Sequence, residues 1–391
     1  MLSEVAAQRL WRVHEPLVVI DFPSPKTDGE WQLTAQGWVG MVPVTPDLTL
    51  VLQPKVAIAN LLGMVEVAYG LQSLRLLNGL VDALTIPELY DRLTELLATR
   101  VLAQVQQGLH RPYQQRAETS PYLRGRLQIE RLLRQPLPGK VPCTFYEPSV
   151  DVADNQILRW TLQRALKSAF GSAATQGQVR RAHRLLQPLV TLQPFRASDC
   201  RDRIYTRLNH AYATLHALCA FFLDACGPSY LPGESASVPF VVNMARLYEE
   251  FVAAWLQTQL PPSWQLRIQE RHPLGEGLHF AIDLVLYVRA TGRPLAILDT
   301  KYKTPTLGPD TADIAQVVAY AAAKGVTEAI LIYPQPLREP LDTVIGGVRV
   351  RTLTFALDGD LVNAGQRFLH DLALPGQPHP NLSTHLPVQL G

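Results

Sequence analysis

AIDLVLYV (residues 281–288), LAILDTKY (295–302) and DIAQVVAY (313–320) follow one another closely in this chain of 391 residues. The first two are apolar runs of strand length, each interrupted by an aspartate, and the third has the spacing of a helix. Two strands joined by the turn TGRP and followed by a helix predict a mixed sheet with flanking helices. These stretches therefore decide the fold class of the C-terminal part, and they also carry its most informative side chains.

Three of these side chains suggest a metal-dependent phosphodiesterase. Asp299 and Lys301 are two residues apart on one strand and so point to the same face. Counting back from Gly292 places Asp283 near Lys301 on the neighbouring antiparallel strand. We therefore expect Asp283 and Asp299 to hold one cation, with Lys301 beside them to position water and stabilise charge on phosphate. Mg²⁺ suits a carboxylate pair, with Mn²⁺ as the alternative.

The competing interpretation is that these are ordinary strand-end acids and a solvated lysine. The apolar runs around Asp283 and Asp299 argue against it, because a charge in such surroundings needs a partner or a metal ion. Gln316 and Tyr320 share one face of the next helix, where they could contact phosphate or fix the acids; the alternative is an exposed amide and a core phenol.

Glu249, in the preceding helical stretch NMARLYEEFVAAWLQ (243–257), lies beside the apolar stripe of that helix. We predict that it helps to position the metal or the lysine and count it with the two aspartates as a metal ligand. The alternative is a surface helix residue, which is how we interpret its neighbour Glu250.

Composition excludes several classes of protein. Hydrophobic residues make up 47% and charged residues 18%, which is typical of a folded globular chain. No apolar run reaches the roughly 20 residues that span a bilayer. The N-terminal stretch lacks the basic segment followed by an apolar segment that is typical of a secretory signal peptide. The four cysteines form no C-x-x-C pair, which favours reduced thiols in a cytoplasmic protein. Zinc-hydrolase, G-x-S-x-G and P-loop motifs are absent from the sequence.

The net charge of +2 hides an asymmetry. Between Arg111 and Arg207 there are 17 Lys and Arg residues against 7 Asp and Glu, so the rest of the chain is acidic overall. A basic middle region is what a nucleic-acid contact surface requires. Solvated helix faces without a partner would show the same excess, and charge alone does not separate the two interpretations.

The order of patterns predicts an α+β multidomain protein with three parts. Residues 1–80 read as a β-rich module because of the alternation in 29–44 and 48–58. Residues 81–235 are predicted to be helical, with helices near 87–109, 154–170, 179–186 and 208–223, an N-cap at Asp154, and a Pro-rich break at 134–148. Residues 236–391 form the predicted α/β domain that carries the aspartates and Lys301, and the linker GPSYLPGESASVP (227–239) leads into it.

Several motifs together resemble the McrC family, the nuclease component of McrBC-type 5-methylcytosine restriction systems. They are VLQPKV (51–56), PYLRGRLQ (121–128), FYEPSVDVADNQILRWTL (145–162), MARLYEEFV (244–252), ILDTKY (297–302) and DIAQVVAYA (313–321). The combination is more selective than any one motif. One departure is Ile282, where the family commonly has proline before the first acid; proline has no chemical role there.

The resemblance implies a C-terminal domain of the PD-(D/E)XK nuclease superfamily. In it Asp283, Asp299 and Lys301 would be the catalytic triad. Glu249 would match the acid of the first helix, and Gln316 and Tyr320 the Gln-x-x-x-Tyr element. The family further implies that the N-terminal part docks on a GTP-hydrolysing AAA+ hexamer, McrB, and stimulates it, while the partner recognises methylated DNA. Arg124 and Arg126 of the LRGR motif are weaker candidates for DNA contacts.

Two other functions remain open at this stage. The chain could be a non-catalytic adaptor that stimulates an AAA+ ring and keeps a vestigial nuclease fold. It could also be a stand-alone, structure-specific nuclease that cuts DNA without a partner.

Overall fold

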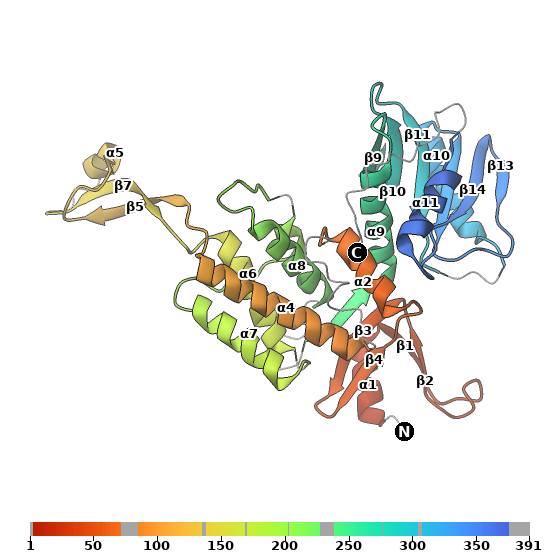
Figure 1. The fold of residues 1–391 in the computed structure, drawn as a ribbon, viewed down its shortest axis with the longest axis horizontal. Coiled ribbons are helices and arrows are strands. Elements are labelled where there is room, and N and C mark those ends of the chain that lie inside the picture. Colours follow the sequence, from red (N-terminus) through yellow and green to blue (C-terminus); the bar gives the residue numbers. More distant parts are fainter. Residues whose placement is uncertain are drawn as a thin grey trace. The chain divides into compact units, whose positions relative to one another are not determined.

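The computed structural model describes residues 3–71, 85–134, 138–168, 170–201, 203–226, 238–275, 277–303 and 307–374. Its contacts divide the chain into two compact units (Figure 1): unit 1 is Met1–Leu89 with Pro239–Gly391, and unit 2 is Tyr90–Val238. The predicted boundaries near 80 and 235, and nearly all of the predicted linker, fall on residues 72–84 and 227–237, outside the described residues. The division into three domains therefore stays a prediction.

The first part of unit 1 contains more helix than the sequence suggested. Its elements are α1 (Glu4–His14), β1 (Val18–Asp21), β2 (Gln32–Ala35), β3 (Trp38–Thr45), β4 (Leu48–Leu52) and α2 (Ile58–Ala68). The strands predicted between 29 and 52 are confirmed, whereas both helices were missed. Ala6 and Leu10 of α1 are buried in the same core as Val42 and Val44 of β3, which stabilises a helix in a segment read as part of a β-rich module.

A strand from the C-terminal half completes the N-terminal sheet. The order is β4-β3-β8, in which β8 (Phe240–Asn243) pairs antiparallel with β3. Gly40 has φ +144°, and a Cβ there would lie 2.0 Å from the carbonyl oxygen of Phe240. Only glycine permits this close approach. Unit 1 is therefore built from both ends of the chain.

A six-stranded mixed sheet forms the rest of unit 1, in the order β13-β14-β12-β11-β10-β9. The strands are β9 (Trp264–Gly275), β10 (Leu278–Val288), β11 (Pro294–Thr300), β12 (Glu328–Tyr333), β13 (Asp342–Ile345) and β14 (Val348–Thr354). β10 pairs antiparallel with β9 and β11, whereas β11, β12 and β14 run parallel. The predicted mixed sheet is confirmed.

Helices accompany this sheet as the sequence predicted. Val317 and Ala321 of α10 (Thr311–Lys324) lie in one buried cluster with Ile297 and Leu331 of the central strands. An aromatic cluster joins α9 (Met244–Gln259) and α11 (Leu361–Asp371) to the sheet. Phe251 and Trp255 of α9 and Phe368 of α11 pack around Phe355, the residue that follows β14. Packing of α2 against α9 joins the N-terminal part to the sheet domain within this unit.

Unit 2 contains the predicted helices and a small sheet that the sequence did not reveal. The helices are α4 (Ile86–Gln107, which begins in unit 1), α6 (Ala153–Lys167), α7 (Ala173–Leu186) and α8 (Tyr212–Ala225). The Pro-rich break predicted at 134–148 does separate helices, but the sequence did not reveal that it contains β7 (Val141–Pro148), which pairs with β5 (Tyr113–Ser120) and β6 (Arg126–Leu127). Pro142 and Pro148 stand near its ends, where they interrupted the expected alternation.

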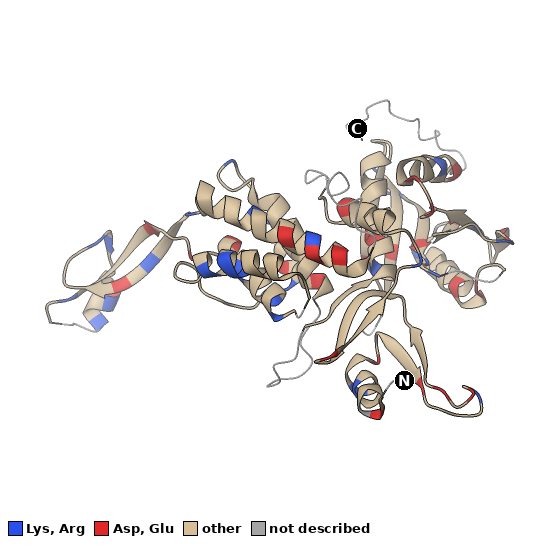
Figure 2. Ribbon diagram, turned by 60° about the horizontal axis from the view of Figure 1, so that its bottom comes forward, with Lys and Arg blue, Asp and Glu red and all other residues tan. Residues whose placement is uncertain are grey.

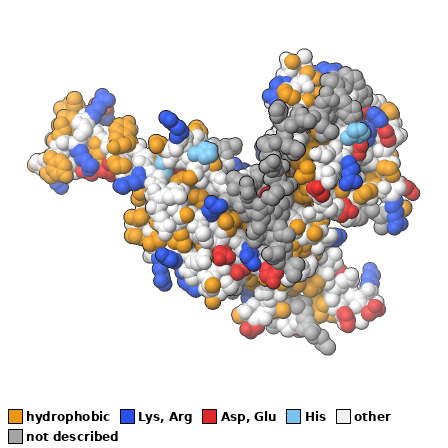
Figure 3. All heavy atoms as spheres, in the orientation of Figure 1, with side chains coloured by type: hydrophobic (Ala, Val, Ile, Leu, Met, Phe, Trp, Pro, Cys, Tyr) orange, Lys and Arg blue, Asp and Glu red, His pale blue; other side chains and the backbone are white. Residues whose placement is uncertain are grey.

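These strands and α5 (Ile129–Arg134) form an extension of unit 2, which we call the arm (residues 113–148). Figure 2 shows blue Lys and Arg positions along it, and Figure 3 shows orange apolar side chains among them. Its exposed large apolar residues are Tyr113, Tyr122, Leu123, Ile129, Leu133 and Tyr146. A surface that is both basic and apolar is typical of a contact region.

A buried polar cluster joins the helices of unit 2. The N-cap of α6 is Val152, so the prediction of an N-cap at Asp154 is wrong. The Asp154 carboxylate instead lies 2.6 Å from His110 Nδ1 and accepts hydrogen bonds from Arg203 and Asn209. It is buried, and these three partners compensate for its loss of water.

No helix in the part of the chain that the structure describes is long and apolar enough to cross a membrane. Cys143, Cys200, Cys219 and Cys226 are free thiols and are buried.

Candidate active site

The two aspartates lie side by side on neighbouring strands. Leu284 pairs with Leu298, so the residues just beyond them, Asp283 and Asp299, are opposite each other. The prediction that Asp283 faces Lys301 is therefore wrong by two positions. The connection between β10 and β11 runs through residues 289–293 rather than being centred on Gly292, and a β-bulge at Leu286/Tyr287 shifts the register further. Even so, the corrected register brings the two carboxylates together more directly.

Lys301 lies at the end of β11, where helix α10 supports it. Its backbone N–H donates to Ile332 on β12 at 2.8 Å, and its Nζ lies 2.7 Å from Asp299 Oδ2. The same Nζ donates to Gln316 Oε1 at 2.9 Å, and Gln316 Nε2 donates to the Tyr320 hydroxyl at 2.8 Å. The structure thus brings Gln316 and Tyr320 to Lys301, in a chain that fixes the position of its ammonium group.

Glu249 approaches the aspartates from α9. Gln269 Nε2 donates a hydrogen bond to Glu249 and lies 3.4 Å from Asp283 Oδ1. Burial raises the pKa of Glu249, and the charges of Glu250 and Asp299 add to this, while the hydrogen bond from Gln269 opposes it. Glu250 forms an ion pair with Arg246 at 3.1 Å on the exposed part of the helix.

Gln269 is the site residue that sequence reasoning missed. It lies in β9 opposite Asp283 and has φ +49°. A left-handed backbone is costly for a residue with a side chain and occurs mostly where the surrounding structure enforces it. Here it coincides with an amide that bridges two carboxylates. No sequence signal marks it, because glutamine carries no motif and its backbone angle is not encoded in periodicity.

A second missed group is a lysine–aspartate cluster on the other side of Lys301. Asp313 is buried, lies 2.6 Å from Lys303 Nζ and 3.8 Å from Lys301 Nζ, and accepts a hydrogen bond from the Tyr333 hydroxyl at 3.4 Å. Lys303 also pairs with Asp310. Burial acts to lower the pKa of Lys303, but its hydrogen bonds to Asp310 and Asp313 outweigh burial and raise it.

The carboxylates destabilise each other's charged forms. Burial raises the pKa of Asp283 to about 6, and the Glu249 charge adds to the rise while Lys301 opposes it. Burial likewise raises the pKa of Asp299 to about 6, with the Asp283 charge adding to the rise and Lys301 again opposing it. Two carboxyl groups with raised pKa values beside one ammonium are typical of sites that receive a cation or a proton.

The residues fit a cation held by two carboxylates. Asp299 is 1% exposed, and its Oδ2 makes an ion pair with Lys301 but no hydrogen bond with correct angles. A buried carboxylate oxygen in this state is a suitable metal ligand. Within the described residues no three His, Cys, Asp or Glu side chains are grouped as a metal site. Mg²⁺ needs only one or two carboxylates because it keeps several waters, so Asp283 and Asp299 suffice, and Glu249 as a third ligand stays a prediction.

We expect Asp283→Asn to stabilise the metal-free protein. The folded-state pKa of about 6 lies above the ordinary value of 3.8, so the folded state binds more protons between these pH values and loses stability as pH rises through them. The gain from the neutral amide should reach about 1 kcal/mol above pH 7, discounted because Asp283 is partly exposed, and should vanish near pH 4. Thermal unfolding with EDTA at pH 5 and pH 8 checks this; a larger gain at pH 5 would contradict it.

Arg124 and Arg126 belong to the arm in unit 2 and are not part of this cluster. The Arg124 guanidinium lies 3.9 Å from the centre of the Phe145 ring and 3.2 Å from Glu147. Arg126 is exposed on β6. Gly125 between them has φ +74°, and a Cβ there would lie 2.4 Å from the Thr144 carbonyl oxygen. The glycine of the LRGR motif therefore has a structural role.

A family model described as "McrBC 5-methylcytosine restriction system component" matches residues 33–334. The chain belongs to this family. The match spans most of both units and includes Asp283, Asp299, Lys301 and the Gln316–Tyr320 pair. It confirms the resemblance to McrC that the sequence motifs indicated.

Known relatives agree with this assignment. A curated protein of Escherichia coli (strain K12), the "Type IV methyl-directed restriction enzyme EcoKMcrBC", is 26% identical over 216 residues, which are 53% of this chain. The match spans 61% of that relative's length.

A chain in a solved assembly of Thermococcus gammatolerans "McrB AAA+ hexamers with bound McrC" has a TM-score of 0.52 at 19% identity. The match covers 90% of this chain and 84% of that one. A second structure, of the McrBC complex from the same organism, matches 65% of this chain and 81% of that one at 20% identity, with a TM-score of 0.43. The first likeness supports the fold alone.

Proposed function

We propose that this chain is the DNA-cleaving subunit of a modification-dependent, McrBC-like restriction complex and that it hydrolyses phosphodiester bonds with Mg²⁺. The proposal depends above all on one observation. Two opposed carboxylates and the half-buried ammonium of Lys301 meet where β10 and β11 adjoin, within a mixed sheet. This is the arrangement expected of a PD-(D/E)XK nuclease domain, and we assign residues 236–391 to that superfamily.

Each side chain of the site then has a definite task. Asp283 and Asp299 bind the cation, which supplies Lewis-acid polarisation of the phosphate and a more acidic water. Lys301 orients the attacking water and stabilises the negative charge that accumulates on phosphate oxygens. Gln316 and Tyr320 hold Lys301 in place through their hydrogen-bonded chain. Glu249 and Gln269 position Asp283 from the opposite side.

We further propose that the chain works with an McrB-like AAA+ GTPase hexamer in the cytoplasm, stimulates its hydrolysis, and acts on methylated DNA selected by that partner. Membership of the restriction-system family supports this, as do the description of the E. coli relative as methyl-directed and the AAA+ hexamers in the Thermococcus assembly. The basic, apolar arm is compatible with a macromolecular partner.

Reconstitution with the AAA+ partner tests the proposal. We expect the two-component complex to cut methylated DNA in the presence of Mg²⁺ and GTP, and to lose cutting on addition of EDTA, with recovery on excess Mg²⁺ or Mn²⁺. Unmethylated DNA of the same sequence is the matched control. Stimulated GTP hydrolysis without any cutting would contradict the nuclease assignment and favour an adaptor. Cutting by the purified chain alone would favour a stand-alone nuclease.

A further inference from the structure

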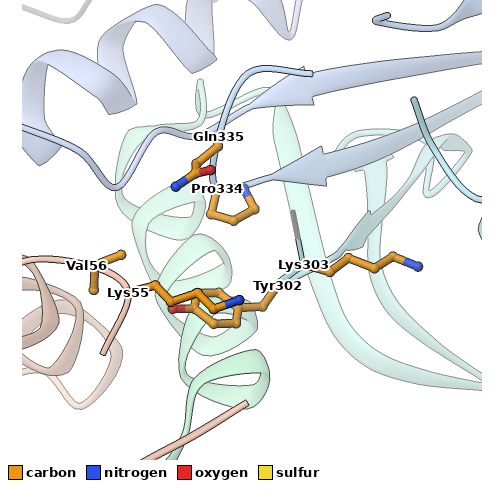
Figure 4. A pocket seen from close by; sticks show the side chains of 6 residues that line it. All are labelled: Lys55, Val56, Tyr302, Lys303, Pro334 and Gln335. Atoms are coloured by element: carbon orange, nitrogen blue, oxygen red, sulfur yellow. The ribbon is translucent and has the colours of Figure 1, made fainter. Parts of the chain in front are cut away.

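A pocket includes the two residues that directly follow Lys301 in the chain, and the proposed chemistry does not use it. Its lining comes from three segments of unit 1: the loop after β4, the residues that follow Lys301, and the residues that follow β12 (Figure 4). These are Lys55, Val56, Tyr302, Lys303, Pro334 and Gln335. The hollow is small and partly open to solvent. It lies at the carboxyl ends of β11 and β12, the edge at which sheets of this kind bind ligands.

The polar groups of this pocket are unusually available. The Lys55 ammonium, the Tyr302 hydroxyl and the Gln335 side-chain amide have no hydrogen bond or ion pair with any described residue. Lys55 is exposed, and no acidic side chain lines the pocket. Lys303 differs, because Asp310 and Asp313 neutralise it, and its side chain points away from the others in Figure 4.

The loop that carries Lys55 is held against the catalytic domain. It leads into α2, which packs on α9, the helix of Glu249. Asn60 Nδ2 donates to the Leu357 carbonyl oxygen at 2.6 Å, which fixes the start of α2. On the other side, the Tyr302 ring lies 6.0 Å from the ring of Tyr248. Lys55 and Tyr302 are therefore positioned by packed elements rather than by a free loop.

The donor set favours an anion of modest size. An ammonium, a phenol and an amide can all donate hydrogen bonds to phosphate oxygens, while Val56 and Pro334 offer apolar contact to a sugar. The pocket is small and partly open, unlike the larger enclosed cavities that hold drug-sized ligands. Tyr302 follows Lys301 directly, so a strand whose scissile phosphate is held at Lys301 has a neighbouring phosphate within reach of such donors.

We propose that Lys55 and Tyr302, with Gln335, form a subsite for a backbone phosphate of the DNA strand being cut, next to the scissile phosphate. The inference rests on the proposed nuclease function and deepens it. It also assigns a role to the VLQPKV motif, because Lys55 of the N-terminal part becomes a DNA contact of the catalytic unit. It further explains why this segment packs against the nuclease domain.

The salt dependence of DNA binding tests the subsite. The full complex is titrated with fluorescent DNA, with Ca²⁺ in place of Mg²⁺ to prevent cutting. We expect Lys55→Ala to weaken binding several-fold at low salt and to reduce the slope of log affinity against log salt by about 1, the effect of one lost phosphate contact. Lys26 is an exposed lysine of the same unit, and Lys26→Ala is the matched control. It should leave both the affinity for DNA and the salt slope unchanged.

Neutral-phosphate substitution locates the contact. Methylphosphonates are placed singly along the cut strand, and we expect one position beside the scissile phosphate to weaken wild-type binding several-fold but to have no further effect on Lys55→Ala. Lys55→Arg should restore the wild-type pattern in part. Additive effects at every position would overturn the subsite.

The outcomes separate this inference from the proposed function. A wild-type complex that cuts DNA, combined with an unchanged salt slope in Lys55→Ala, overturns the subsite and leaves the nuclease assignment intact. A wild-type complex that neither binds nor cuts DNA overturns both. Thermal unfolding of each variant checks that the exposed substitution has not altered folding.

Discussion

Asp299→Asn and Lys301→Ala are each expected to lower the rate of DNA cleavage by the reconstituted complex about 10²- to 10³-fold. Asp299 is buried beside Asp283 and is proposed to bind the cation, and the amide removes the charge without changing shape. Lys301 is held 2.7 Å from Asp299 and 2.9 Å from Gln316, and alanine removes the group that faces the developing phosphate charge. Losing one preorganised stabiliser of this kind typically costs 10²–10³ in rate.

The assay is single-turnover cleavage of methylated DNA, measured beside stimulation of GTP hydrolysis. Stimulation should stay near the wild-type level in both variants, because neither substitution removes a folded element. Asp358→Asn and Lys26→Ala, exposed residues of the same unit, serve as matched controls. Cutting at wild-type rate by both site variants would rule out this site as the nuclease centre.

Asp154→Ala is expected to lower the free energy of unfolding of unit 2 by about 3–5 kcal/mol. The carboxylate is buried, accepts hydrogen bonds from Arg203 and Asn209, and lies 2.6 Å from His110 Nδ1. Its removal therefore leaves a partly buried guanidinium and an imidazole without this carboxylate partner. Breaking one side of a buried ion pair costs this much because the remaining charge is uncompensated. Asp224→Ala, which removes an ion pair to the exposed Arg201, should cost about 1 kcal/mol or less.

Amide hydrogen exchange in helices α6 and α8 measures this loss of stability within unit 2, separately from any unfolding of unit 1.

The pH dependence of the stability of unit 2 gives a further check. Burial alone would raise the pKa of Asp154, but hydrogen bonds from Arg203, His110 and Asn209 lower it below 3.8. The stabilisation is therefore present above about pH 4 and is lost as pH falls below it. Equal protection in Asp154→Ala and wild type would show that the cluster contributes little.

The sequence predicted the C-terminal sheet of unit 1 well because its strands are buried on both faces or are bounded by clear turns. β10, β11 and α10 lie within a few residues of the stretches 281–288, 295–302 and 313–320 from which they were predicted. The spacing of Asp299 and Lys301 placed both on one face, and the helical spacing of Gln316 and Tyr320 brought them to Lys301. Such local relations follow from the periods of strand and helix.

What the sequence did not predict depends on non-local geometry. The register of β10 against β11 changed by two positions because turn length and a bulge are not encoded in apolar periodicity. The backbone of Gln269 and the partners of Asp154 depend on packing between distant segments. In the same way, β7 was hidden by its prolines, and its pairing with β5 and β6 makes it a strand.

The pairing of β8 with β3 has a consequence for biosynthesis. While the ribosome makes unit 2, the edge of β3 from Trp38 to Met41 has no neighbour, since Phe240–Asn243 does not yet exist. The inserted unit 2 can fold first, because it is formed by one continuous stretch of the chain, Tyr90–Val238. This edge of β3 must stay unpaired or be shielded by a chaperone until the insertion has emerged, and a fragment that ends before β8 should aggregate through that open edge.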